Sequence, residues 1–299
     1  VAVSGGPDSL ALAVLAKIYA IKKKLVSKFF IVDHKIRKES SQEAKLIRRK
    51  LSSVGINAQI LIWKGKKPTK NIQSLARKKR YELLIANSSK SKIKNILLGH
   101  HEGDVLENFF IRILRGSGLK GLVSFDKKAR INKINLLRPL LDHKKDDLIF
   151  IAKYVFNFYV KDPSNENDLF KRVKIRKLID EMQKNGLDKK KFLNTIKNLK
   201  YSDKAIKFYV NKNLNENTHY SSKENDYTIN MNFFQQPHEI VFRSLAFIIN
   251  IIGGRYYSPR GKKIDMIINK IHNKVLSKVT LGGCIIEMQH ETVIISKEY

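Results

Sequence analysis

The stretch that decides the fold is Val1-Ala2-Val3-Ser4-Gly5-Gly6-Pro7-Asp8-Ser9. Its first three residues form a short apolar run that predicts a strand, and Leu10 to Ala20 predicts a helix rich in small apolar residues. Between them, glycines let the backbone approach a ligand closely. Backbone N–H groups, the helix amino end and the hydroxyls of Ser4 and Ser9 then offer donors to an anion. The stretch predicts a phosphate-binding turn.

This turn differs from the common nucleotide-binding loop G-x-x-x-x-G-K-S/T, because no lysine follows its glycines. A loop with that lysine suits transfer of the γ-phosphoryl group. A loop that offers hydroxyls and the carboxylate of Asp8 suits a pyrophosphate that departs whole. The alternative is a plain strand–helix connector with no ligand.

Three further strands are predicted at Phe29 to Val32, Ala58 to Trp63 and Ile96 to Leu98, with helical sequence between them. This alternation predicts an α/β fold with a parallel, doubly wound sheet. Polar clusters directly follow three of the four strands, at residues 4–9, at 33–34 and at 100–104. Ligands bind at the carboxyl edge of such sheets, so these clusters are expected to form one site.

The second half of the chain has a different composition. A Lys-rich helical region is expected from Phe170 to Phe208, and the polar segment Asn211 to Asp226 is interpreted as a linker or loop. Helices are expected at Pro237 to Ile252 and Lys262 to Ile271, and a closing β-hairpin at Val279 to Tyr299. We place a domain boundary near residue 200.

The composition limits the class of protein. Lys and Arg number 59 against 27 Asp and Glu, a net charge of +32, and part of this follows from a generally Lys-, Asn- and Ile-rich composition. The remainder indicates a polyanionic partner, which charge alone does not identify as RNA, DNA or an anionic membrane. The single cysteine, Cys284, permits no disulfide within the chain and fits a reducing compartment. No apolar run approaches the roughly 20 residues of a membrane span. A targeting segment before Val1 stays open.

The residues Ser4 to Ser9 resemble the SGGxDS signature of the PP-loop ATP pyrophosphatases, which cleave ATP between the α- and β-phosphates and adenylate a substrate oxygen. Further motifs resemble one family within this class, the tRNA(Ile)-lysidine synthetases. They are Val32-Asp33-His34 with Arg37 and Ser40; Asn71, Gln73, Ala76, Arg77, Arg80 and Tyr81; His100-His101 with Asp104 and Glu107; Arg112 with Leu114 to Gly118; Arg138-Pro139-Leu140-Leu141; Asp162-Pro163-Ser164-Asn165; and Thr280 to Cys284.

The resemblance implies a fold, a reaction and a set of partners. Residues 1–200 would form the PP-loop catalytic domain, and residues 201–299 a smaller α+β domain that contacts tRNA. The enzyme would be a cytoplasmic ligase that joins L-lysine to C2 of the wobble cytidine of a CAU-anticodon tRNA(Ile). ATP would adenylate the cytidine, and AMP and pyrophosphate would be released. The resemblance leaves a homodimer open.

The resemblance also implies roles for single residues. The ATP-binding residues would be Ser4, Gly5, Gly6, Pro7, Asp8, Ser9 and Asp33. Asp104 and Glu107 lie three residues apart on a predicted helix, so their carboxylates share a face that could bind lysine or Mg²⁺. Arg112 would stabilise the α-phosphate. The alternatives are a solvated helix face for the acids, a salt bridge for Arg112 and a helix cap for Asp33.

The expected tRNA contacts are basic. They would come from Arg77, Arg80, Arg115, Arg172 and Arg176, and more broadly from the Lys-rich stretch between residues 171 and 207. The histidines at 34, 100 and 101 lack a third ligand at a diagnostic spacing, so a structural role is expected for them rather than zinc binding.

Two other functions are alternatives. A tRNA thiolase of the same class would resemble enzymes that depend on several cysteines, which this chain lacks. A basic RNA-binding module with a vestigial nucleotide site is disfavoured by the intact Ser4, Asp8, Ser9, Asp104 and Glu107. The sequence departs from the lysidine synthetase pattern at Gly103, and at Val173, where the family has asparagine between two arginines.

Overall fold

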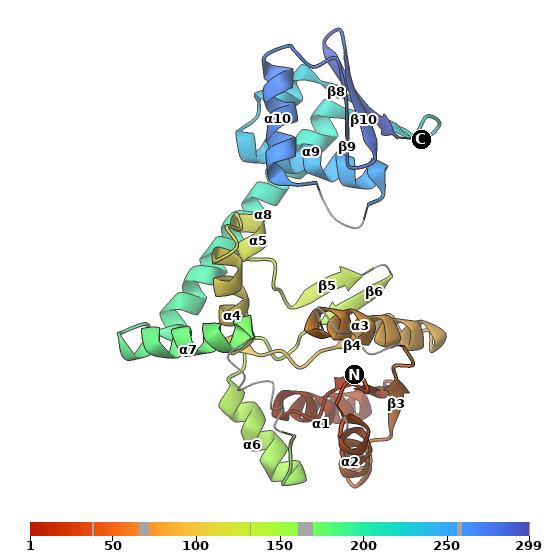
Figure 1. The fold of residues 1–299 in the computed structure, drawn as a ribbon, viewed down its shortest axis with the longest axis vertical. Helices are drawn as coiled ribbons and strands as arrows, with labels where there is room; N and C mark the ends of the chain where they lie inside the picture. Colours follow the sequence, from red (N-terminus) through yellow and green to blue (C-terminus); the bar gives the residue numbers. More distant parts are fainter. Residues whose placement is uncertain (38, 66–71, 132, 161–169, 256–258, 299) are drawn as a thin grey trace. The chain divides into compact units, whose positions relative to one another are not determined.

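The computed structural model describes residues 1–37, 39–65, 72–131, 133–160, 170–255 and 259–298 (Figure 1). The chain divides into two compact units, Val1–Thr195 and Ile196–Tyr299. Each is described by itself. The segments Asn71 and Asp162-Pro163-Ser164-Asn165, which carry part of the motif resemblance, lie outside the described residues.

The first unit contains two groups of strands. Strands β1 (Ala2–Val3), β2 (Phe29–Asp33) and β3 (Ala58–Ile62) are parallel. Strand β4 (Asn95–Leu97) pairs in parallel with β6 (Ile134–Leu137), which pairs in antiparallel with β5 (Lys128–Ile131). The predicted parallel α/β architecture is confirmed. Neither β5 nor β6 is predicted from sequence, because each has only four residues and β5 includes two charged ones.

Helices cover both faces of the β1-β2-β3 sheet (Figure 1). On one face, Phe29 and Ile31 pack with apolar residues of α1 (Pro7–Lys22), α2 (Ser40–Ser52) and α6 (Lys145–Phe156). On the other face, Phe30 packs with Leu84 of α3 (Ile72–Lys90). Successive residues of a strand point to opposite faces, so β2 needs a continuous apolar run to fill both cores. The layered arrangement leaves the carboxyl ends of the strands free for a site.

Helix α4 (Glu102–Ile113) follows β4, and the short α5 (Leu119–Leu122) comes after it. Helix α7 (Lys171–Lys184) packs along α4. The first turn of α8 (Lys189–Asn217) brings Phe192 onto α4, stacked on Phe110 at 5.2 Å and edge-on to Phe109 at 5.4 Å between ring centroids. This packing lets side chains of α7 reach the acidic residues of α4.

The second unit packs helices against an antiparallel sheet. The sheet has the order β7 (Thr218–Ser221), β8 (Asp226–Asn230), β11 (Thr292–Lys297), β10 (Cys284–Gln289) and β9 (Lys278–Leu281). The 3-10 helix η2 (Met231–Gln235), α9 (His238–Gly253) and α10 (Gly261–His272) contribute to one apolar core with the end of α8. Among the described helices, none is long and apolar enough to cross a membrane.

The interpretation of Asn211 to Asp226 as a linker or loop is wrong. Helix α8 continues to Asn217, and β7 follows directly. Asn213 and Asn217 are buried, and the Asn217 amide donates to Asn213 Oδ1 at 2.8 Å. The polar, Asn-rich composition suggests an exposed segment, but these two asparagines are hydrogen-bonded to each other inside the core.

The closing β-hairpin is also wrong, since residues 278–297 form three strands, β9, β10 and β11, rather than two. The Gly282-Gly283 pair makes the first turn, with φ of +69° and +86°. Such positive φ values favour glycine. A second turn at His290-Glu291 separates β10 from β11.

Candidate active site

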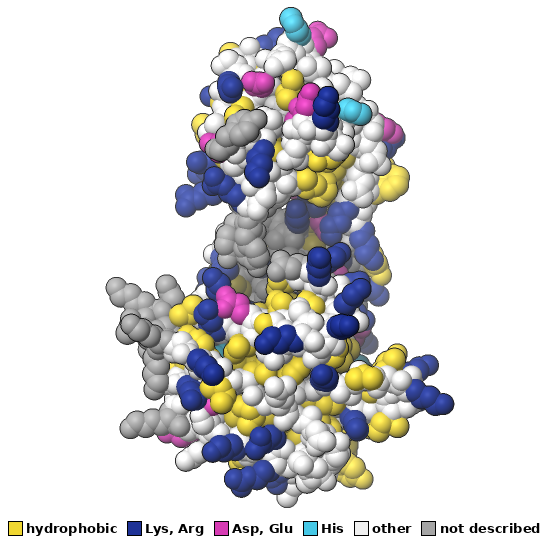
Figure 2. Space-filling model, turned by 90° about the vertical axis from the view of Figure 1, so that its right-hand side faces the viewer, with side chains coloured by type: hydrophobic (Ala, Val, Ile, Leu, Met, Phe, Trp, Pro, Cys, Tyr) yellow, Lys and Arg dark blue, Asp and Glu magenta, His cyan; other side chains and the backbone are white. Residues whose placement is uncertain are grey.

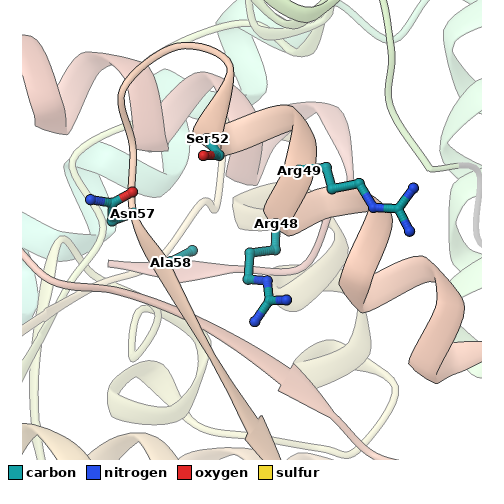
Figure 3. A pocket seen from close by; sticks show the side chains of 5 residues that line it. All are labelled: Arg48, Arg49, Ser52, Asn57 and Ala58. Carbon is teal, nitrogen blue, oxygen red and sulfur yellow. The ribbon is translucent and has the colours of Figure 1, made fainter.

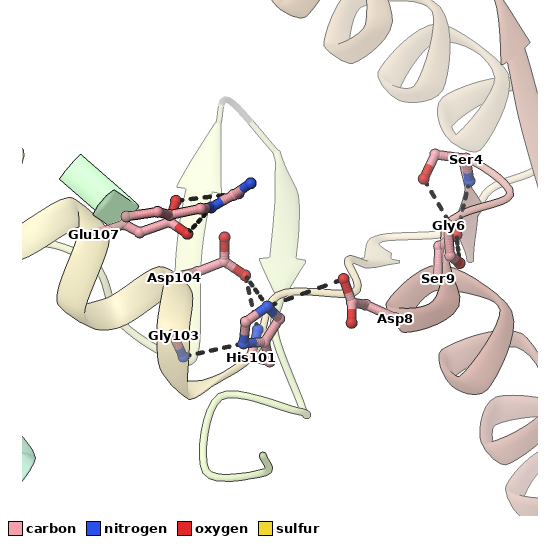
Figure 4. A network of polar contacts seen from close by, with 9 residues as sticks. Ser4, Gly6, Asp8, Ser9, His101, Gly103, Asp104 and Glu107 are labelled. Atoms are coloured by element: carbon pink, nitrogen blue, oxygen red, sulfur yellow. Dashed lines mark hydrogen bonds and ion pairs between the residues drawn. The ribbon is translucent and has the colours of Figure 1, made fainter. Parts of the chain in front are cut away.

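The turn after β1 is cross-linked by the side chain of Ser9. The Ser9 hydroxyl accepts from Ser4 N–H at 3.1 Å and from Ser4 Oγ at 3.2 Å, and donates to the Gly6 carbonyl at 3.0 Å (Figure 4). Gly5 has a φ of +86°, and a Cβ there would lie 2.8 Å from Ile47 Cγ1. Both features fix the loop in a conformation that only glycine at position 5 permits.

Helix α1 starts at this turn with Pro7, after Gly6 as N-cap. The first helical hydrogen bond runs from Leu10 N–H to the Gly6 carbonyl, at 3.1 Å. The N–H groups of Asp8 and Ser9 therefore have no partner within the helix, as in the first turn of any helix. Together with the helix dipole, these groups suit an anion, and the phosphate-binding role stays a prediction.

The end of β4 lies against this helix start. A Cβ on Gly99 would lie 2.9 Å from the Asp8 carbonyl oxygen and 3.0 Å from Ser9 N. Both are backbone atoms, so neither can move without moving the turn. Gly99 thus allows the His100-His101 segment to approach the phosphate loop.

Replacing Gly99 with Ala should destabilise the protein by about 1–3 kcal/mol, because the added methyl overpacks two backbone segments. Nucleotide affinity should fall as the loop shifts. Urea unfolding and ATP titration measure the two effects. The matched control is Gly118→Ala, since a Cβ there meets no atom within 4 Å. Equal unfolding midpoints for the two variants would contradict this tight approach.

His101 connects the phosphate loop to the acids of α4 (Figure 4). Gly103 N–H donates to His101 Nδ1 at 3.0 Å, so the ring proton lies on Nε2. That nitrogen is 4.0 Å from Asp8 Oδ2 and 3.7 Å from Asp104 Oδ2. Asp104 Oδ2 also accepts from His101 N–H at 2.9 Å, which completes a capping box at the start of α4. The cap places Asp104 beside Asp8.

Asp8 is electrostatically unusual. Burial raises its pKa, and Asp104 adds to this, while His101, Lys145 and Arg176 oppose it. Its Oδ1 is buried with no hydrogen-bond partner among the described residues. A buried, unpartnered carboxylate oxygen is costly in the free protein, so this atom is a candidate for contact with a ligand.

Glu107 is buried and engaged by Arg176 of α7. The Arg176 Nε donates to Glu107 Oε1, and its Nη2 to Oε2 at 3.4 Å (Figure 4). Arg176 therefore lies with the acids, although a tRNA contact is expected for it from sequence. Val173, one turn before it, is buried, which accounts for an apolar residue where the family has asparagine.

Asp33 ends β2 and is buried. Its carboxylate accepts from Lys35 N–H and Ser40 Oγ, both at 2.9 Å, and from Ser41 Oγ at 2.6 Å. Burial alone would raise its pKa, but these hydrogen bonds hold the pKa below the usual value. The bonds hold together the turn between β2 and α2, whose N-cap is Glu39, so Asp33 supports this turn without being the helix cap.

Several arginines gather near the His-His segment. Arg77 and Arg80 lie 5.2 and 5.6 Å from the Tyr81 ring, and the charge of Arg172 acts on Arg80. His100 contacts the Phe125 ring edge-on at 5.2 Å between centroids. Burial lowers the pKa of His100 to about 4, with further lowering by nearby arginines, so the ring is neutral at pH 7. The cluster is basic and partly aromatic.

Arg138 is the functional candidate that the sequence analysis missed. It follows β6, is buried, and lies 4.7 Å from the Phe125 ring. Its Nη1 donates to the Asp126 carbonyl at 2.6 Å, while its Nε is buried with no partner among the described residues. The resemblance of Arg138-Pro139-Leu140-Leu141 to a family motif is the signal that the sequence offers, because β6, the strand before it, is not predicted.

Arg112 and Arg115 lie farther from the acids. Arg112 is eight residues after Asp104, which is about 12 Å along α4. Arg115 is exposed beyond the carboxyl end of that helix. Neither is brought to the phosphate loop in this structure.

A separate shallow pocket of about 290 Å³ lies between α2 and the start of β3 (Figure 3). Arg48, Arg49, Ser52, Asn57 and Ala58 line it. It opens at the amino end of β3, whereas the phosphate loop lies at the carboxyl edge of the sheet. It is therefore not the site built by residues 4–9.

The comparisons with known proteins agree with this geometry. Residues 1–182 match the family model described as PP-loop domain. The tRNA(Ile)-lysidine synthase of Wolbachia sp. subsp. Brugia malayi is 32% identical over 301 residues, covering 100% of this chain and 70% of that protein. The tRNA(Ile)-lysidine synthase of Orientia tsutsugamushi is 31% identical over 314 residues, covering 100% and 69%.

A solved structure shares the fold. The U34-tRNA thiolase from Methanococcus maripaludis superposes with a TM-score of 0.55 at 22% identity, covering 67% of this chain and 70% of that chain. At this identity the likeness concerns the fold alone. The family match and the full-length relatives lead to one conclusion: the chain belongs to the tRNA(Ile)-lysidine synthase family and is built on its PP-loop domain.

Proposed function

We propose that this protein uses ATP to join L-lysine to C2 of the wobble cytidine of a CAU-anticodon tRNA(Ile), forming lysidine with release of AMP and pyrophosphate. The observation that carries the proposal is that two sets of residues lie close together. A lysine-free phosphate loop at residues 4–9 lies beside the acids of α4, joined through His101.

The first half-reaction is adenylation. The cytidine O2 attacks the α-phosphate of ATP, and pyrophosphate leaves. The N–H groups at the start of α1 and the Gly5-Gly6 backbone would hold the departing pyrophosphate, since they offer donors without a mobile cation. Ser9 supports this loop through its three internal hydrogen bonds, so its contribution to ATP binding is chiefly to position the backbone.

The second half-reaction joins lysine. The ε-amine of lysine attacks C2 of the adenylated cytidine, loses a proton and expels AMP. Asp104 and Glu107 would bind the ammonium and accept the proton, and Asp104 is placed closer to the phosphate loop. Arg176 compensates the buried Glu107 carboxylate and positions it.

Mg²⁺ is part of the proposal. Among the described residues, no three His, Cys, Asp or Glu side chains are arranged to hold a metal ion. Mg²⁺ needs only one or two carboxylates beside substrate phosphates and water, and Asp8 Oδ1 and Asp104 fit that requirement. Glu107, expected as a second ligand, is engaged by Arg176. When bound, the ion would neutralise phosphate charge.

The tRNA would contact basic residues of the first unit. Arg77, Arg80, Arg138 and Arg172 surround an edge of the site that already contains aromatic rings. Lysine and arginine side chains are also spread over the displayed face of each unit (Figure 2). An anticodon loop is single-stranded, so the wobble base can turn out toward this cluster at low cost. Arg115 is proposed to contact tRNA phosphates, and Arg112 is proposed to stabilise the α-phosphate of ATP.

A thiolase reaction is disfavoured because the single cysteine is buried and its thiol is protonated near neutral pH. Cys284 is buried, and its Sγ donates to the Ile249 carbonyl at 3.3 Å. Burial raises the pKa of the Cys284 thiol to about 11, so almost no thiolate exists near neutral pH. Thiolate is the reactive form in sulfur chemistry.

The direct test is incorporation of labelled lysine into a CAU-anticodon tRNA(Ile) transcript, with a CAU-anticodon tRNA(Met) as matched control. We expect incorporation that requires ATP and is specific for tRNA(Ile). The tRNA affinity should also fall steeply with salt, because phosphate contacts release counterions. No ATP-dependent incorporation would remove the proposal, and a flat salt response would remove its phosphate-dominated interface.

A further inference from the structure

Helix α8 carries an exposed row of alternating lysines and aromatic rings. Lys197, Tyr201, Lys204 and Phe208 are spaced by four, three and four residues, so they share one helical face about 16 Å long. Tyr201 is 53% exposed and Phe208 is 65% exposed. We call these four residues the α8 stripe. All of them belong to the second unit.

The stripe is not part of a core. The opposite face of α8 is anchored by Ile196, Asp203 and Val210, which are buried. Large aromatic rings on a polar helix lose favourable burial when they face water. Their exposure beside lysines indicates a surface that a partner covers.

The charges around the rings favour one kind of partner. The ammonium groups of Lys197 and Lys204 lie 5.9 and 5.7 Å from the centre of the Tyr201 ring. A flat group that stacks on Tyr201 would bring any negative charge attached to it within reach of both. Unpaired nucleotides have this combination, because each joins a stacking base to a phosphate. A paired duplex hides its base faces, so it cannot use the rings in this way.

We propose that the α8 stripe binds an unpaired segment of RNA, with bases stacked on Tyr201 and Phe208 and phosphates paired with Lys197 and Lys204. The inference rests on the proposed tRNA substrate and adds a second, separate point of contact to it. Charge complementarity with the chain's net charge of +32 supports RNA over a second copy of this protein.

The test compares the Tyr201→Ser/Phe208→Ser variant with wild type. The control is Tyr154→Ser on α6, whose ring is 83% exposed outside the stripe. The probes are the tRNA transcript, an unstructured oligoribonucleotide and a fully paired RNA duplex of equal length. Urea unfolding midpoints should agree among all variants, because each replaced ring is exposed.

We expect the double serine variant to bind the single strand and the tRNA at least about fivefold more weakly, with duplex binding and the salt slope unchanged. Lys197→Ala/Lys204→Ala should instead reduce the salt slope for the single strand by about 1.4. Unchanged single-strand affinity, or an equal loss for the duplex, would overturn the inference. So would loss of binding to phosphatidylserine vesicles in the serine variant while RNA affinity stays intact.

The proposal for the α8 stripe and the proposed function can fail independently of each other. If the wild-type protein forms no lysidine while the stripe variants still lose RNA affinity, the enzyme assignment fails and the RNA surface stands. If lysidine forms and the stripe variants bind RNA as wild type does, the enzyme assignment stands and the RNA surface on α8 is refuted.

Discussion

Asp104→Asn should lower the rate of lysine incorporation about a hundredfold or more, without changing the unfolding midpoint. The fold should persist because the asparagine Oδ1 can still accept from His101 N–H, the bond that caps α4. The reaction should fail because an amide neither attracts the lysine ammonium nor accepts its proton, and such proton transfer contributes about 10² to 10⁴ in rate. Single-turnover incorporation of labelled lysine at saturating ATP and tRNA measures the effect.

The matched control for this change is Asp180→Asn, an exposed acid on α7. It removes the same charge away from the phosphate loop, so incorporation should equal that of wild type. Wild-type turnover in Asp104→Asn would show that Asp104 has no part in lysine transfer. A large fall in its unfolding midpoint would show instead that Asp104 acts mainly as a cap.

Asp203→Ala should destabilise the second unit by about 3–5 kcal/mol, because it leaves the buried Arg243 guanidinium without its main counter-charge. Asp203 and Arg243 are each only 4% exposed and are hydrogen-bonded to each other. Lys207 binds the other carboxylate oxygen at 2.8 Å. Urea unfolding of the full chain measures the loss, with the two units followed as separate transitions if they unfold separately.

Two further variants test whether the loss of stability comes from the uncompensated buried charge of Arg243. Glu239→Ala removes a second partner of Arg243, at 2.6 Å, but its side chain is 48% exposed, so the cost should be about 1 kcal/mol or less. Asp203→Ala with Arg243→Met should recover most of the stability, since no buried charge remains. A loss under about 1 kcal/mol in Asp203→Ala would contradict a buried, mutually dependent pair.

The same pair predicts a dependence on pH. Burial alone would raise the Asp203 pKa, but bonds from Lys207 and Arg243 hold it below its ordinary value of 3.8. A lowered folded-state pKa contributes stability that is complete above the unfolded value and is lost as pH falls through the folded value. The extra stability of wild type over Asp203→Asn should therefore be constant near neutral pH and shrink only below about pH 4.

The conformation of residues 1–9 could be predicted from sequence because it is determined locally. Nine consecutive residues specify a strand, a glycine turn and a helix start, and the structure has all three. The parallel strands followed from apolar runs at regular intervals. Their carboxyl ends then brought residues 4–9 and 100–104 together, as the topology of such sheets requires.

Two features that sequence did not predict depend on packing between distant segments. Arg176 reaches Glu107 only because α7 packs along α4, a contact separated by 69 residues. Asn213 and Asn217 are buried only because the second unit closes around them. Polarity and helical periodicity describe a residue's own segment, so they miss both cases.

The most direct test of the central claim is the fate of the terminal phosphates of ATP. With γ-³²P-labelled ATP, lysine and tRNA(Ile), the account predicts that the label leaves as pyrophosphate in step with lysidine, because residues 4–9 hold a pyrophosphate that departs whole. Label recovered as orthophosphate with ADP as co-product would contradict it.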